Sequence, residues 1–89
     1  MIKIDNSELS IYEVENLHKD LLKELESGEM IIDLANVNKI DMSVIQLFIS
    51  AKKSALESSI AFAITNVNEE LSNIFKSAGC LSLLGEKNV

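Results

Sequence analysis

The sequence of 89 residues contains no proline or arginine and only one cysteine. One cysteine cannot form an internal disulfide, which is typical of proteins from a reducing compartment. Without arginine or a basic stripe, the chain does not resemble a nucleic-acid-binding protein. No apolar run reaches the ~18 residues of a membrane-spanning helix, and the first residues lack the basic-then-apolar pattern of an export signal. We therefore expect a cytoplasmic protein with no membrane insertion.

The usual features of catalytic, metal and phosphate-binding sites are also missing. The three glycines are isolated, so no glycine-rich phosphate loop is predicted. His18 and Cys80 have no partners at metal-ligand spacing. No serine stands in a Gly-x-Ser-x-Gly elbow, which would indicate a hydrolase. We expect neither a metal nor a cofactor, and we do not expect an enzyme.

Charge is distributed unevenly along a chain that is otherwise typical of a globular protein. Apolar residues make up 47% of the sequence, which is too many for a disordered protein. Residues 1–33 hold three lysines and nine carboxylates, a net charge of −6, whereas residues 34–89 hold five of each and are neutral. An acidic first third beside a neutral, apolar remainder suggests a protein partner met across the neutral part. The alternative is that the acids simply form a solvated helix face.

The first third of the chain predicts one helix preceded by short strands. Residues 2–4 alternate in polarity and predict a strand, and residues 8–11 predict either a second short strand or a lead-in. A helix is predicted over residues 11–26, because apolar residues recur there at helical spacing. Ser10 and Glu13 have the spacing of a capping box at its start, and Gly28 stands where a C-terminal cap would end it.

Two apolar strands and two further helices are predicted in the rest of the chain. Residues 30–34 are too short and too uniformly apolar for an amphipathic helix, so they predict a strand buried on both faces. Residues 60–65 predict a second buried strand. A helix is predicted between them over residues 44–57, and a third helix starts after a cap at Asn66 or Asn68. The apolar tail beyond it either packs against the core or adds an edge strand.

This order of elements predicts an α/β fold in a single small domain spanning residues 1–89. Helices that alternate with strands imply parallel neighbouring strands and right-handed crossovers. We expect about four strands in one mixed sheet, with three or more helices. A chain of this length buries only about two-thirds of its unfolded surface, so its core is modest.

The helix predicted over residues 44–57 has a wider apolar arc than a helix needs to join a core. One apolar stripe of it should face the sheet, and Ile45, Ile49 and Leu56 lie off that stripe. The excess indicates either deeper burial of the helix or an exposed patch that awaits a partner.

Ser43, which immediately precedes this predicted helix, has two interpretations. In the structural one, Ser43 and Gln46 form a capping box that contributes about 0.5–2 kcal/mol. In the functional one, Ser43 is a phosphorylation site, because the free amides and partial positive charge of a helix N-terminus accommodate a phosphate. The phosphate would add nearly two negative charges at the edge of any partner surface on the helix.

The run IIDLANVNKIDMSVIQLFISAKKSA, residues 31–55, also carries a family resemblance. An aliphatic strand ends in Asp33-Leu34, a short loop leads to Ile40-Asp41, and the hydroxyl residue Ser43 opens an aliphatic helix. This pattern resembles the signature segment of STAS domains, the family of bacterial anti-sigma factor antagonists. The flanking strand and helices also fit the family, so the resemblance covers nearly the whole chain and implies a STAS-like domain.

The resemblance implies a non-catalytic module for protein–protein interaction. In the family's best-understood branch, the antagonist binds a kinase-type anti-sigma factor, which phosphorylates a serine at the start of this helix and so ends the interaction. Ser43 corresponds to that serine, and Asp41 to the acid that shapes the preceding loop. We expect the partner to be bound by residues at and after this point: Asp41, Met42, Ser43, Val44, Ile45 and Ile49.

The chain differs from that branch at two positions. The usual pattern is Asp-Ser-Ser-Gly, whereas this chain has Asp41-Met42-Ser43-Val44. A bulky methionine therefore replaces a small neighbour, and a β-branched valine replaces glycine. The alternative is a constitutive STAS adaptor of a lipid-transporter ATPase or of a chemotaxis or two-component signalling complex, with no phosphorylation. The apolar excess on the helix also leaves open a weak homodimer.

Overall fold

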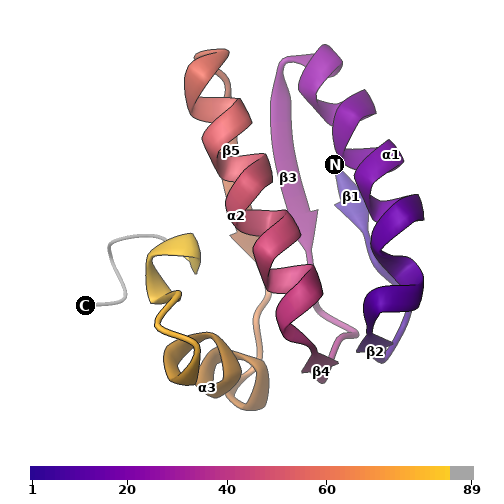
Figure 1. Ribbon diagram of the computed structural model, residues 1–89, viewed down its shortest axis with the longest axis vertical. Coiled ribbons are helices and arrows are strands. Elements are labelled where there is room, and N and C mark those ends of the chain that lie inside the picture. The colour runs from indigo at the N-terminus through magenta and orange to yellow at the C-terminus, as the bar shows by residue number, and fades with distance from the viewer. Residues whose placement is uncertain (85–89) are drawn as a thin grey trace.

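Short strands alternate with helices along the chain, and a computed structural model describes residues 1–84 of it (Figure 1). The strands are β1 (Ile2–Lys3), β2 (Glu8–Leu9), β3 (Glu29–Asp33), β4 (Lys39–Ile40) and β5 (Ala61–Thr65). The helices are α1 (Val14–Ser27), α2 (Met42–Glu57) and α3 (Glu69–Ser77), together with the 3-10 helices η1 (Ile11–Glu13) and η2 (Leu81–Leu84). The α/β class and the three predicted helices are therefore confirmed.

The strands form two small parallel sheets, so the predicted mixed sheet of about four strands is wrong. One sheet has the order β1-β3-β5, and the other pairs β2 with β4. The physical reason is that turns interrupt the chain between β1 and β2 and again between β3 and β4. The two turns meet, because the Ser7 carbonyl accepts hydrogen bonds from the amides of Asn38 and Lys39. Strands β2 and β4, which follow these turns, therefore pair with each other and not with the main sheet.

Helices α1 and α2 lie side by side on one face of the three-stranded sheet (Figure 1). Met30 and Ile32 of β3 are buried, whereas Ile31, which alternates with them, is only half-buried. In β5, an edge strand, Ala61 is exposed and Ala63 half-buried. The prediction of strands buried on both faces is therefore wrong for β5, because both covering helices pack on the same face.

The predicted helix ends agree with the local chemistry in most places. Ser10 and Glu13 form the capping box, although the first turn after Ser10 is the 3-10 helix η1. Gly28 ends α1 with φ of 97°, a left-handed conformation that glycine adopts without a steric cost. Of the two asparagines proposed to cap α3, Asn68 does so, and its side chain accepts from the Leu71 amide.

The core extends from the sheet to the start of α2 and to α3. Helix α3 packs on β4, and η2 packs against β5, so the apolar tail packs down rather than adding an edge strand. The largest fully buried side chains come from β2 through α3: Leu9, Met30, Ile32, Leu34, Val37, Val44, Ile45, Phe48, Leu71 and Phe75. Val44 and Ile45, near the start of α2, belong to this core, so packing holds the start of the helix in place.

Candidate functional site

The N-terminus of α2 is capped by Asp41 and not by Ser43. Oδ1 of Asp41 accepts hydrogen bonds from the amides of Ser43, at 3.1 Å, and Val44, at 3.3 Å. The helix therefore begins at Met42, two residues before the predicted start, and the predicted capping box of Ser43 with Gln46 is wrong. Aspartate is as good an N-cap as serine, and its carboxylate reaches two free amides of the first turn.

Ser43 belongs to the first turn of α2, and its hydroxyl donates a hydrogen bond to Oδ1 of Asp41. The other carboxylate oxygen of Asp41 accepts from the Ile11 amide at 3.1 Å. Asp41 thus joins the start of α2 to η1, thirty residues earlier in the sequence. The Ser43 hydroxyl holds the pKa of Asp41 below its ordinary value, with help from the three backbone amides and against the effect of desolvation.

A second carboxylate fixes the loop that leads from β3 toward this site. Asp33, at the end of β3, is buried and accepts hydrogen bonds from the Ala35 amide at 2.9 Å and from Nδ2 of Asn66 at 3.1 Å. The Ala35 amide, then the Asn66 side chain, lower the pKa of Asp33, and Lys3 adds a smaller effect. Asp33 therefore links the ends of β3 and β5, a structural role.

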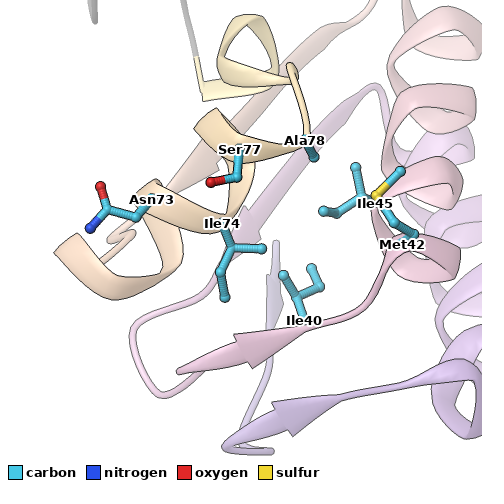
Figure 2. Close-up of a pocket in the computed structure, with 7 residues that line it drawn as sticks. All are labelled: Ile40, Met42, Ile45, Asn73, Ile74, Ser77 and Ala78. Atoms are coloured by element: carbon cyan, nitrogen blue, oxygen red, sulfur yellow. The ribbon is translucent and has the colours of Figure 1, made fainter.

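An apolar groove opens between the start of α2 and α3 (Figure 2). Its volume is about 410 Å³, and Met42 and Ile45 of α2 face it from one side (Figure 2). The residues that line it come from β4, α2 and the end of α3: Ile40, Met42, Ile45, Asn73, Ile74, Ser77 and Ala78. We call this surface the α2–α3 groove.

The structure separates the six residues predicted to bind a partner into two groups. Asp41, Met42 and Ile49 are exposed, and Ser43 is half-buried. Val44 and Ile45 are 0% and 1% exposed, because they face the core beneath the first turn of α2. The Val44 side chain therefore has no surface to offer a partner, and Ile45 contributes only to the floor of the groove.

The residues of α3 that line the groove were not predicted from the sequence. Asn73, Ile74, Ser77 and Ala78 lie at helical spacing on one face of α3, which is a signal that they share a surface. Nothing in that spacing says that the face points toward Met42. The position of α3 depends on Asn68, whose Nδ2 donates to the Val37 carbonyl and to Oδ1 of Asn38, each at 3.0 Å.

Across residues 1–84, no three His, Cys, Asp or Glu side chains come together in a way that could hold a metal ion. In that same range, each helix is either too short or too polar to cross a membrane.

Fold and site together define a small α/β domain with parallel strands and an apolar surface groove beside a capped helix start. The model of the STAS domain family matches residues 3–88, nearly the whole chain. The chain therefore belongs to the STAS domain family, which includes modules resembling anti-sigma factor antagonists as well as transporter and signalling modules. A comparison with curated protein sequences gave no match.

Proposed function

We propose that this protein is a non-catalytic interaction module that binds a protein partner over the start of α2 and the α2–α3 groove. The observation that carries the proposal is Met42, whose side chain is 49% exposed at the rim of a groove with an apolar floor. An exposed apolar side chain beside a concave apolar surface is typical of a protein–protein contact. Membership of the STAS family supports a partner of the signalling or transport type.

We further propose that the partner is a kinase-type regulator and that phosphorylation of Ser43 ends the contact. The Ser43 hydroxyl touches the carboxylate of Asp41, so a phosphate there would place nearly two negative charges beside an existing one. The phosphate would also compete with Asp41 for the amides of Ser43 and Val44. The modification would thus change the charge at the groove rim and strain the bond from Asp41 to η1.

The two departures from the family's Asp-Ser-Ser-Gly pattern have different consequences. Val44, in place of glycine, is fully buried and so does not stand in the way of an approaching kinase. Met42, in place of a small residue, is exposed directly before Ser43 and would meet any enzyme that acts there. Met42 is therefore the residue that a modifying kinase would have to accommodate.

The second candidate function is a constitutive adaptor in which Ser43 is never phosphorylated. It is favoured by the same hydrogen bond, because a half-buried hydroxyl that already donates to Asp41 has a structural role without any switch. In this function the groove and Met42 still bind a partner, such as a transporter ATPase or a signalling kinase. The two candidates differ only at Ser43.

The experiment is quantitative capture of partners from the native cells with tagged wild-type, Ser43→Ala and Ser43→Asp proteins, together with mass spectrometry of the Ser43 peptide. Ser50→Asp, an exposed serine of α2, is the matched control. The switch predicts phosphate on Ser43 and loss of the main partner with Ser43→Asp alone. An unmodified Ser43 and a partner retained by all four proteins would overturn the switch and support the adaptor.

A further inference from the structure

Helix α2 carries an exposed apolar stripe that continues away from the α2–α3 groove. Met42, Ile49 and Leu56 are 49%, 44% and 68% exposed and stand seven residues apart. The three side chains lie on one face of α2 over about 21 Å, with the half-buried Lys52 between Ile49 and Leu56. Ile45, between Met42 and Ile49, is buried in the core and is not part of the stripe. Residues seven apart are two turns apart, so the three exposed side chains occupy the same position of successive heptads of α2.

A second groove lies beside the far end of this stripe, between α2 and η2. Its volume is about 290 Å³, and the apolar residues that line it include Ile49, Leu56 and Leu83. Lys52 and Lys53 also line it, and none of its described lining residues is acidic. Nζ of Lys52 donates to the Ser82 carbonyl at 2.9 Å, whereas Lys53 is exposed, and within residues 1–84 neither lysine is in an ion pair.

We propose that the stripe is the docking surface for an amphipathic helix of the partner, with acidic residues of that helix opposite Lys52 and Lys53. A helix fits this row, because two packed helices meet along rows of side chains that run for several turns. The two lysines favour an acidic sequence on it. The inference rests on the proposed function and names the kind of segment that the partner contributes.

A second copy of this chain fits the stripe less well. In an antiparallel pair of α2 helices centred on Ile49, Lys53 would face Ile45 of the other copy, and Asp41 would face Glu57. In a parallel pair, Lys52 would face Lys52. Neither arrangement gives the lysines a carboxylate, and each brings like charges together, which disfavours self-association.

The test uses two synthetic helical probes of about 18 residues and the full chain. Both peptides have leucine at positions a and d. One has glutamate at the flanking positions, and the other has lysine. Fluorescence anisotropy gives the Kd of each. We expect the glutamate peptide to bind at least about tenfold tighter than the lysine peptide, because only it complements the two lysines. Equal affinities, or no binding of either peptide, would overturn the proposal.

Substitutions on the protein locate the contact. Ile49→Asp should raise the Kd of the glutamate peptide at least about tenfold. The double variant Lys52→Glu, Lys53→Glu should make the lysine peptide bind more tightly than the glutamate peptide. Leu22→Asp is the matched control, because Leu22 is 50% exposed on α1. All four side chains are at the surface or its edge, and thermal unfolding checks that each variant folds. An unchanged Kd with Ile49→Asp would place the peptide elsewhere and overturn the proposal.

Two further results separate this inference from the proposed function. If the native partner is lost with Ser43→Asp or Met42→Glu but is retained by Ile49→Asp, the proposed function stands and the helix-docking stripe is wrong. If sedimentation shows a dimer that Ile49→Asp dissociates, the stripe belongs to a second copy of the chain, and the proposal of a partner helix is overturned.

Discussion

Asp41 and Ser43 share one hydrogen-bonded cluster but contribute to it unequally. Asp41 accepts from three backbone amides in two elements, whereas Ser43 donates one hydroxyl to the same carboxylate. Removing the acceptor leaves several donors at the helix start without a partner, while removing the hydroxyl leaves the cap in place. Stability at this site should therefore depend on Asp41 more than on Ser43.

The first prediction compares the two residues directly. Asp41→Ala should lower the melting temperature by roughly 4–8 °C, which is the usual effect of losing an N-cap in a domain of this size. Ser43→Ala should lower it by less, because Asp41 still caps the helix. Thermal unfolding followed by circular dichroism measures both. A larger loss with Ser43→Ala would show that the hydroxyl, and not the carboxylate, holds the helix start.

The second prediction concerns the loss of folding stability at low pH. The pKa values of Asp33 and Asp41 are lowered in the folded protein, so both carboxylates bind protons more readily when the chain unfolds. Their contribution to stability is therefore fully present above the ordinary pKa of about 4 and is lost as pH falls below it. Urea unfolding between pH 7 and pH 3 should show this loss. Asp41→Asn should lose less stability between pH 7 and pH 3 than the wild type. An unchanged pH dependence of stability in this variant would show that Asp41 does not contribute to it.

At the scale of elements, α3 forms one wall of the α2–α3 groove, and Asn68 holds it there. Its Oδ1 caps α3 through the Leu71 amide at 2.8 Å, and its Nδ2 reaches back to the loop before β4. The same residue therefore fixes where α3 begins and how close it lies to the start of α2.

The third prediction concerns the loss of this link when Asn68 is replaced. Asn68→Ala should lower the free energy of unfolding by about 1–2 kcal/mol, because both the cap and the bonds to the loop are lost. Asn73→Ala is the control, since Asn73 is exposed on the same helix and lies outside the cap at Asn68. Urea unfolding measures both variants. Equal losses would show that Asn68 does not hold α3.

The helices were predictable because each carries several turns of apolar spacing and a capping residue next to it. Ser10, Gly28 and Asn68 mark ends that the structure confirms. The cap of α2 was predicted at Ser43 and not at Asp41, because both residues are equally good caps. Sequence alone does not say which of them adopts the extended conformation. Strand β4 has only two residues, too few for any periodicity, and the split into two sheets follows from its pairing with β2.

The site itself was predictable only on the α2 side. Met42, Ser43 and Ile49 follow from the family pattern and the apolar arc, but burial decides which side chains of α2 are available. Val44 and Ile45 are as apolar as Ile49, but they belong to the buried core, and Ile45 lines the groove together with Ile40 of β4 and Ile74 of α3. Residues brought together from β4 and α3 have no local signature, because their contact is set by the tertiary structure.

At the scale of the whole molecule, a small core leaves little stability to spare. A domain of this length is held by a net of only several kcal/mol, so the last described segment matters. Leu83 of η2 is buried, and Ser82 is held to α2 by Lys52. The short tail therefore contributes both to the core and to the second groove.

The fourth prediction tests this contribution. Leu83→Ala should lower the free energy of unfolding by about 2–4 kcal/mol, because it leaves a cavity in the core to which Leu83 belongs. Ser82→Ala is the control, since Ser82 is exposed and its bond to Lys52 uses only the backbone carbonyl. A Leu83→Ala protein as stable as Ser82→Ala in urea unfolding would show that the tail does not belong to the folded domain.

The proposed binding site is tested most directly by asking whether the native partner needs Met42. Tagged wild-type, Met42→Glu and Leu22→Glu proteins would be compared by quantitative mass spectrometry of captured partners, since both side chains are about half exposed but only Met42 lines the α2–α3 groove. If the partner binds at Met42, Met42→Glu should capture at least about tenfold less of the main partner, and Leu22→Glu should retain it. A partner retained equally by all three proteins would contradict the proposed binding site.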